Sequence, residues 1–509
     1  MINWHRLLVL AHRYIGIGLG LLFVVWFVSA FVIMYTGGMP SLTDAERLQH
    51  QTNLQLFEVR VTPQHAQLLT QRSDAPVLRM VMGRPAYQYA AGRGPTVFAD
   101  DGSFLRQNQV SSRDIVAGFF DIDTDLVERV GRVDEVDQWT LTIRNELPLE
   151  KFVLNDADRT EVYVSQQRGQ VVLETTARDR FLAWIGAIPH WLYFTSMRAH
   201  TETWSATVII LSGVGTVMAV LGIVLIFTQW LRVRPFRLTD AIPYKGLMRW
   251  HYIAGLLFGL VTLTWVFSGL LSMDSYRVYE RPMLALPSDA LQDGVLDLDA
   301  FNAVTSMEVG TALAGLSSGR NLKEVRFKRS LGQEYYELLV SDEESSWGFT
   351  TLFIDAATLE PKTEFYSPQQ IVERVQAVVT GYEVTESREL SSYGSYYYSR
   401  PNGDYATPPL PALEMRFDDP GGTWVYADLF KGELVYRIHR VGRVQRWLYN
   451  GLHSLNFRFW YANRPIWDIG VIVLLTGGLT LCGLGTFLGF RRMYRNLMRW
   501  FRNRAVASQ

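Results

Sequence analysis

The chain contains very little cysteine and few charged residues. Its one cysteine among 509 residues, Cys482, lies inside an apolar run. An intramolecular disulfide is therefore impossible, and cysteine-ligated zinc and iron–sulfur sites are excluded. Charged residues make up 19% of the chain, against about a quarter in soluble globular proteins. The net charge of −1 gives no overall basicity of the kind that nucleic-acid binding needs. Any redox chemistry would need a cofactor that other residues hold.

Charge is also missing from the centres of four long apolar runs. Each run exceeds the roughly 20 residues of helix that cross a hydrocarbon core. The first run is too long to be the apolar core of a signal peptide, which has about 7–15 residues. The four predicted transmembrane helices are 14–35, 205–231, 250–273 and 466–490.

Basic residues gather on one side of these predicted spans. Arg6 and Arg13 precede the first span, five Arg and Lys residues lie in 232–249, and six Arg residues lie in 491–509. Such short basic flanks face the cytoplasm. We therefore expect the protein in a bacterial inner membrane with both termini on the cytoplasmic side. Residues 37–203 and 274–465 would then be exported to the periplasm.

Two matches within the chain indicate an internal duplication. Residues 11–30 align without a gap on 250–269, which places His12 on His251 and Gly16 on Gly255. Residues 160–174 align on 423–437, and the same register continues until His190 falls on His453. Repetition on this scale predicts two similar halves related by a pseudo-twofold axis.

The exported segments are predicted to mix helices and strands. The segments 111–120 and 367–379 each open with Ser and place apolar residues at helical spacing. The repeated segments around Gly169 and Gly432 read as a strand, a turn and a second strand. The predicted fold is an α-helical membrane protein with four transmembrane helices, internally duplicated, plus two periplasmic α+β domains, each built from two small helix-plus-hairpin units.

The predicted boundaries follow from the spans and the repeats. They are 1–36 for the N-terminal flank and first span, 37–180 for the first periplasmic domain, 181–231 for an interfacial segment and second span, 232–249 for a cytoplasmic loop, 250–273 for the third span, 274–443 for the second periplasmic domain, 444–490 for an interfacial segment and fourth span, and 491–509 for a cytoplasmic tail.

Four of the nine histidines recur between the halves. His12 and His251 are predicted near the cytoplasmic ends of the first and third spans, and His190 and His453 just outside the second and fourth spans. Each pair takes one residue from each half. Two imidazoles on opposite sides of a macrocycle are the ligand set of a six-coordinate haem, so these four residues are the predicted ligands of two b haems.

Neighbouring glycines and arginines support haem binding, although the glycines and the histidines also have alternative roles. Gly16 and Gly255 lie nearly on the faces of the first pair and would let a haem approach the helices, although small residues four apart also serve helix packing. Arg13 and Arg249 would hold propionates. A single interfacial histidine is alternatively a polar anchor. His439 and His200 are not repeated, and His439 is the reserve ligand. The repeated tryptophans, Trp26 with Trp265 and Trp184 with Trp447, favour a core or interfacial role.

These features resemble the bacterial PepSY-associated transmembrane-helix family over nearly the whole chain. The resemblance rests on HRYIGIGLG (12–20), HYIAGLLFG (251–259), QRGQVV (167–172), KGELVY (431–436) and RWLYNGLH (446–453). The first half departs from the family pattern with AWIGAIPH (183–190). The family includes iron-regulated inner-membrane proteins, and some members resemble dihaem reductases that release iron from ferric siderophores. The resemblance implies PepSY-like periplasmic domains and electron transfer towards a periplasmic ferric chelate.

The sequence thus predicts a haem-dependent membrane reductase that functions in iron uptake. No strand is followed by a Gly-x-Gly-x-x-Gly turn, so the electron donor would be a separate cytoplasmic flavin, quinol or reductase. The alternative is a non-enzymatic, membrane-anchored protein whose exported domains bind and regulate a partner in the cell envelope. In that case the spans would be only an anchor, and the histidines would only pack.

Overall fold

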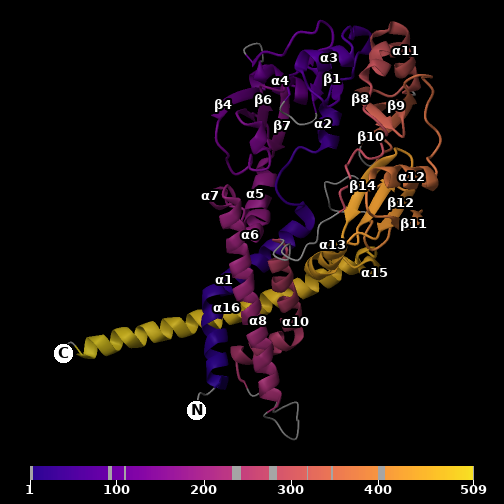
Figure 1. Cartoon of the computed structure of the whole chain (residues 1–509). Helices are drawn as coiled ribbons and strands as arrows, with labels where there is room; N and C mark the ends of the chain where they lie inside the picture. Colours follow the sequence, from indigo (N-terminus) through magenta and orange to yellow (C-terminus); the bar gives the residue numbers. More distant parts are fainter. Residues whose placement is uncertain are drawn as a thin grey trace.

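Four long helices form a bundle from which β-sheets extend (Figure 1). The computed structural model describes residues 4–89, 94–107, 111–231, 242, 244–273, 284–317, 319–345, 348–398 and 407–507. All four helices are long and apolar enough to cross a membrane, as predicted. They are α1 (Trp4–Thr36), α8 (Thr201–Trp230), α10 (Leu247–Leu271) and α16 (Ile466–Ala507).

The bundle follows the duplication seen in the sequence. Both α1 and α10, the first helix of each half, contact both α8 and α16. Phe23, Phe27, Val266 and Leu475 lie in the shared core. We call the end of the bundle next to the sheets the domain end, and the opposite end, where α1 begins, the free end. The basic segment 232–241, on which part of the predicted orientation depends, lies outside the described residues.

A six-stranded sheet joins the two halves beyond the domain end. Its strand order is β10-β9-β8-β1-β2-β3. The first half supplies β1 (Pro76–Val81), β2 (Arg84–Tyr89) and β3 (Val97–Phe98). The second half supplies β8 (Leu322–Ser330), β9 (Gln333–Ser341) and β10 (Phe349–Asp355). The helices α3 (Pro63–Thr70) and α11 (Met307–Leu316) belong to the same region.

The two halves meet at the antiparallel pair β1 and β8, where Leu78 lies opposite Val325. These two side chains are fully buried in a core to which both halves contribute. The loop after α2 (Asp44–His50) strengthens the junction, because Gln51 and Lys323 exchange hydrogen bonds between side chain and backbone. The segments that follow the first and third spans therefore share one core, an arrangement that the sequence did not predict.

Each half also contains a four-stranded antiparallel sheet with one helix. The orders are β4-β5-β6-β7 and β11-β12-β13-β14. The helices α4 (Ser112–Phe120) and α12 (Pro368–Val378) begin where predicted, each capped by the preceding Ser111 or Ser367. The strands are β4 (Val127–Val133), β5 (Leu149–Leu154), β6 (Glu161–Ser165), β7 (Gln170–Thr175), β11 (Val384–Leu390), β12 (Ala412–Phe417), β13 (Trp424–Asp428) and β14 (Glu433–Ile438).

The repeated hairpins form as predicted. Gly169 and Gly432 turn β6 into β7 and β13 into β14, with φ of +63° and +64°. This left-handed region costs glycine little, which explains why glycine stands at both equivalent positions.

Short helices connect the sheets to the bundle. In the first half these are α5 (Ala177–Ile185), α6 (Ala187–Trp191) and α7 (Thr195–Arg198). In the second half they are α13 (Arg440–Gln445), a π-helical turn (Arg446–Gly451), α14 (Leu452–Ser454) and α15 (Arg458–Tyr461). They begin at Ala177 and Arg440, slightly before the predicted boundaries at 181 and 444. The helices α6 and α14 carry the two repeated histidines of the domain end.

One carboxylate beside these connections makes stability depend on pH. Glu174 on β7 has a pKa of about 7, because burial and the nearby Glu46 and Asp179 charges raise it. An unfolded glutamate has a pKa of about 4.3. The folded state therefore binds the extra proton, and its stability falls as the pH rises from about 4.5 to about 7.

The Tm of the full chain is expected to decrease by a few degrees over this pH range. The difference between the two pKa values corresponds to at most about 4 kcal/mol, and solvent screening of the partly exposed carboxylate reduces this. Glu174→Gln should flatten this dependence, whereas Glu128→Gln, at an exposed position on β4, should leave it unchanged. Thermal unfolding followed by tryptophan fluorescence would measure it. Equal pH dependence in the wild type and Glu174→Gln would contradict the assignment.

Candidate metal centres

The structure brings His190 and His453 together at the domain end. Their ring centroids are 6.0 Å apart, and the ring planes meet at 67°. With metal–nitrogen bonds of about 2 Å and ring nitrogens about 1 Å from the ring centre, two imidazoles on opposite sides of one metal have centroids about 6 Å apart. The spacing of this pair therefore fits axial ligation of a single haem iron.

Hydrogen bonds fix which nitrogen of His190 is available. Its Nδ1 lies 3.2 Å from the carbonyl oxygen of Trp26 and 3.0 Å from Oγ of Ser29. Because a carbonyl oxygen only accepts, Nδ1 carries the proton, and Nε2 keeps the lone pair that a metal needs. Burial, together with the nearby His453 ring, lowers the pKa of His190 to about 3, so the ring is neutral.

His453 repeats these contacts in the second half. Its Nδ1 lies 3.2 Å from the carbonyl oxygen of Trp265 and 3.1 Å from Oγ of Ser268. Burial lowers its pKa as well. Trp265 and Ser268 are the residues that align with Trp26 and Ser29. His190 and His453 therefore make equivalent contacts, although the segment AWIGAIPH (183–190) departs from the family pattern.

The second histidine pair lies towards the free end and is also tied through Nδ1. Nδ1 of His12 is 2.9 Å from the carbonyl oxygen of Met218 on α8. Nδ1 of His251 is 3.2 Å from the carbonyl oxygen of Leu481 on α16. Met218 and Leu481 are equivalent in the repeat register. Because a carbonyl oxygen only accepts, Nδ1 carries the proton in both rings, and both keep Nε2 for a ligand.

Two glycines make room for these rings. A Cβ added to Gly222 would lie 3.0 Å from Cε1 of His12, and a Cβ added to Gly485 would lie 3.0 Å from Cε1 of His251. Sequence reasoning missed both residues. The signal was present, because the ungapped register that pairs His190 with His453 continues into α8 and α16 and places Gly222 on Gly485.

Gly222→Val is expected to displace the His12 ring and to lower the content of any free-end haem by more than half, because a β-branched side chain would occupy the space of the ring. Gly213→Val is the matched control on the same helix, since a Cβ there would have no atom within 4 Å apart from the neighbouring backbone of its own helix. Haem content per chain, measured from the absorbance of the pyridine complex, tests this. Wild-type content in Gly222→Val would contradict the geometry.

The other predicted contributors lie around the free-end pair. A Cβ at Gly16 would meet Sδ of Met218 at 3.6 Å, and one at Gly255 would meet Cδ1 of Ile226 at 3.6 Å. These are ordinary contact distances, so the alternative of helix packing suits both glycines, and a role in cradling haem stays a prediction. Arg13 is half-buried and Arg249 is exposed. Their contact with propionates also stays a prediction.

Two buried indole N–H groups lie close to the domain-end histidine pair. The indole Nε1 of Trp26 and that of Trp265 are buried without a hydrogen-bond partner among the described residues. Both rings pack against the core of the bundle, as predicted. Buried unpaired N–H groups are rare, and these two stand at equivalent positions, next to the carbonyl groups that hold His190 and His453. A ligand with carboxylate groups, such as the propionates of haem, would satisfy them.

The unrepeated histidines lie elsewhere. His439 immediately precedes α13, and His200 immediately precedes α8 and is exposed. The structure places His453, rather than the reserve ligand His439, against His190. Within the described parts of the chain, no group of three or more His, Cys, Asp or Glu side chains could hold a metal ion.

Comparison with known proteins adds no family. No family model matches the chain, and no curated protein sequence matches it significantly. The resemblance to PepSY-associated transmembrane-helix proteins therefore stays a prediction.

Proposed function

We propose that this chain is a dihaem b-type oxidoreductase of the bacterial inner membrane, which moves electrons across the membrane to a periplasmic ferric siderophore in iron uptake. One observation carries the proposal. Two histidine pairs lie at different depths of one bundle, each pair takes one residue from each half, and all four rings are tied through Nδ1 so that Nε2 is left for iron.

The spacing of the pairs along the helices supports two haems in series. Trp26, whose carbonyl holds His190, lies 14 residues after His12, and Trp265 lies 14 residues after His251. At 1.5 Å per residue, the two pairs are about 21 Å apart along the bundle. A single cofactor would not serve both faces of the membrane over that distance, whereas two would divide it.

The residues of the chain would have separate tasks. His12 and His251 would hold one haem, and His190 and His453 the other. The indole N–H groups of Trp26 and Trp265 would orient the second haem through its propionates. When bound, each haem would supply a one-electron Fe(III)/Fe(II) couple. The apolar core between the pairs, which includes Phe23, Phe27, Val266 and Leu475, would exclude water from the path.

The proposed acceptor follows from iron chemistry and from the family resemblance. Hard oxygen ligands hold Fe(III) more tightly than the softer Fe(II), so reduction would release iron from a ferric siderophore. The sequence has no nicotinamide or flavin fingerprint. The donor would therefore be a cytoplasmic flavin, quinol or reductase partner. The proposed orientation puts the arginine-rich end of α16 on that side of the membrane.

Electron transfer into sealed liposomes tests this function. The full chain is reconstituted in vesicles that enclose ferrioxamine and a colorimetric Fe(II) chelator, and dithionite is added outside. We expect Fe(II) to form inside at least 10-fold faster than in empty vesicles, and His12→Ala to reduce the rate to that of the empty vesicles. A rate that equals that of empty vesicles for the wild-type protein, loaded with haem, would favour the non-enzymatic alternative.

A further inference from the structure

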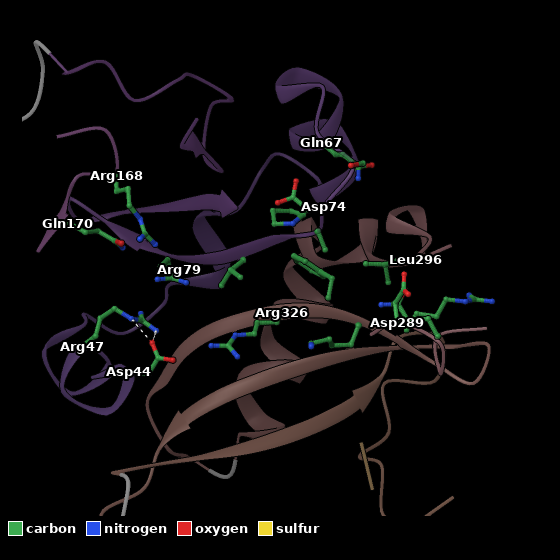
Figure 2. Close-up of a pocket in the computed structure, with 18 of the residues that line it drawn as sticks. Asp44, Arg47, Gln67, Asp74, Arg79, Arg168, Gln170, Asp289, Leu296 and Arg326 are labelled. Carbon is green, nitrogen blue, oxygen red and sulfur yellow. Dashed lines mark hydrogen bonds and ion pairs between the residues drawn. The ribbon is translucent and has the colours of Figure 1, made fainter. Parts of the chain in front are cut away.

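A large cavity lies where the two halves meet, far from the histidine pairs. Its volume is about 930 Å³, within the range of about 300–1,000 Å³ that small-molecule sites occupy. Figure 2 shows its walls, which come from β1 of the first half and β8 of the second, with the β6–β7 hairpin and the segment around Asp289. In Figure 1, β1 and β8 stand at the opposite end of the molecule from the start of α1. We call this space the seam cavity.

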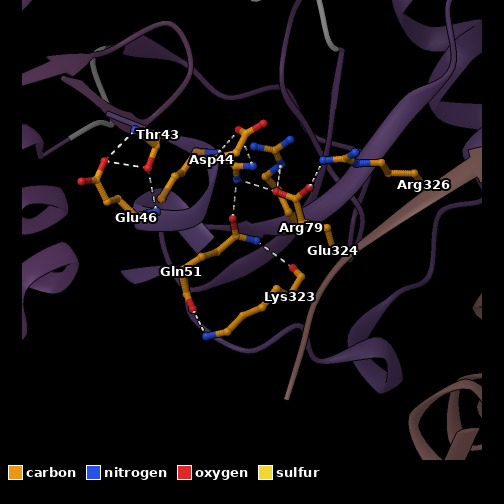
Figure 3. A network of polar contacts seen from close by, with 9 residues as sticks. Thr43, Asp44, Glu46, Gln51, Arg79, Lys323, Glu324 and Arg326 are labelled. Atoms are coloured by element: carbon orange, nitrogen blue, oxygen red, sulfur yellow. Dashed lines mark hydrogen bonds and ion pairs between the residues drawn. The ribbon is translucent and has the colours of Figure 1, made fainter. Parts of the chain in front are cut away.

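One end of the seam cavity is basic. Four arginines from separate segments converge there (Figure 2): Arg47, Arg79, Arg168 and Arg326. Three of them share a single carboxylate, Glu324, whose side chain is fully buried. The distances to the Glu324 carboxylate oxygens are 2.5 Å from Arg47, 3.3 Å from Arg79 and 3.1 Å from Arg326 (Figure 3). Asp44 also pairs with Arg47, at 3.2 Å, so these three arginines face two carboxylates and positive charge remains in excess.

Among these arginines, Arg79 is the most deeply buried and lacks a hydrogen bond at its Nε. Its side chain is 8% exposed. Its buried Nε is the atom that faces Glu324 at 3.3 Å, yet Nε donates no hydrogen bond to any of the described residues. Burial lowers the pKa of Arg79 to about 9. Glu324 opposes this effect, while the charges of Arg47, Arg168 and Arg326 add to it. A buried guanidinium that donates so few hydrogen bonds is costly, so an anion beside it would be stabilising.

The rest of the cavity has a different character. Asp74, Asp289 and Gln67 lie towards the other end, with Leu296 among the apolar contacts (Figure 2). The basic end would therefore take the anionic group of a ligand, while the remaining volume would take a polar or apolar body. Arginine forks bind carboxylate and phosphate groups in preference to halide ions because they donate two parallel hydrogen bonds.

We propose that the seam cavity is a binding site for a small ligand that carries a carboxylate or phosphate group, held by Arg47, Arg79, Arg168 and Arg326. Because β1 and β8 belong to different halves, the bound anion bridges the halves and stabilises their pairing. The site is independent of haem binding and of the proposed reduction.

Titration of the full chain in detergent tests the site with two probes, citrate and inorganic phosphate. Calorimetric binding and Tm are measured at constant ionic strength, which is kept with chloride. We expect saturable binding of at least one probe and a concentration-dependent rise in Tm. Binding of citrate alone identifies a carboxylate ligand, and binding of phosphate alone identifies a phosphate ligand.

The matched variants use arginines that pair with one glutamate each. Arg168 pairs with Glu146 at 3.1 Å inside the cavity, whereas Arg129 pairs with Glu150 at 2.7 Å on β4, outside it. Arg168→Gln should weaken binding at least 10-fold, and Arg129→Gln should leave it unchanged. Arg79→Lys, which retains the charge beside Glu324 but loses the fork, should also weaken binding. Absence of saturable binding by both probes, or equal affinity in Arg168→Gln and the wild type, would overturn the proposal.

Discussion

Replacing His190 or His453 with alanine is expected to remove one of two haems and to leave the other. The ring centroids of His190 and His453 are 6.0 Å apart, so both rings would bind the same iron. Loss of either imidazole would leave that iron with one protein ligand and weakly held. Each single variant should therefore behave like the double variant. Haem content should fall from two per chain to one, and reduction of a ferric chelate should fall to the uncatalysed rate.

His439→Ala and His200→Ala are the controls for this prediction, because neither residue contributes to the pair. Both should retain two haems per chain and wild-type chelate reduction. Loss of the domain-end haem in His439→Ala, with retention in His453→Ala, would show that the repeat register does not identify the ligand. Normal chelate reduction in the His190 and His453 variants would rule out a haem at the domain end.

Replacing His12 or His251 with alanine is expected to remove the other haem. These side chains are held on different helices by the carbonyl groups of Met218 and Leu481, so the domain-end pair should remain assembled. Dithionite on the periplasmic side should still reduce the remaining haem. The cytoplasmic donor should no longer reduce it, because about 21 Å of apolar bundle would separate them.

His5→Ala offers a matched control for the free end, since His5 lies on the same helix but has no counterpart in the repeat. It should keep both haems and the response to the donor. Haem content equal to wild type in both His12→Ala and His251→Ala would remove the free-end site from the account. Loss of both haems would show instead that the bundle as a whole depends on these residues.

The sequence was most informative where the duplication preserved a register. It predicted the four spans, because about 20 apolar residues are needed to cross a bilayer, and it paired His190 with His453 because the offset has no gap. The lengths of the helices were less predictable. The helix α1 begins at Trp4 and α16 continues to Ala507, since arginine, leucine and methionine favour helix beyond the apolar run.

The seam between the halves could not be predicted. Pairing of β1 with β8 joins residues about 250 positions apart, and no local pattern specifies which edge strands meet. The acceptors of the hydrogen bonds made by the histidine Nδ1 atoms could not be predicted from the local sequence either. The bonds of His12 and His251 go to the backbone carbonyl groups of Met218 and Leu481, and since every residue has a carbonyl group, residue type does not reveal these partners. The rings also need space at Gly222 and Gly485, which the sequence marks only by repeating a glycine at equivalent positions.

The most direct test of the account is the haem content and spectrum of the purified full chain, expressed with ample haem. We predict two b haems per chain with the low-spin absorption of bis-histidine iron in both the oxidised and the reduced protein. A folded, colourless protein, or a content that does not change in His190→Ala, would contradict the central claim that the paired histidines bind haem.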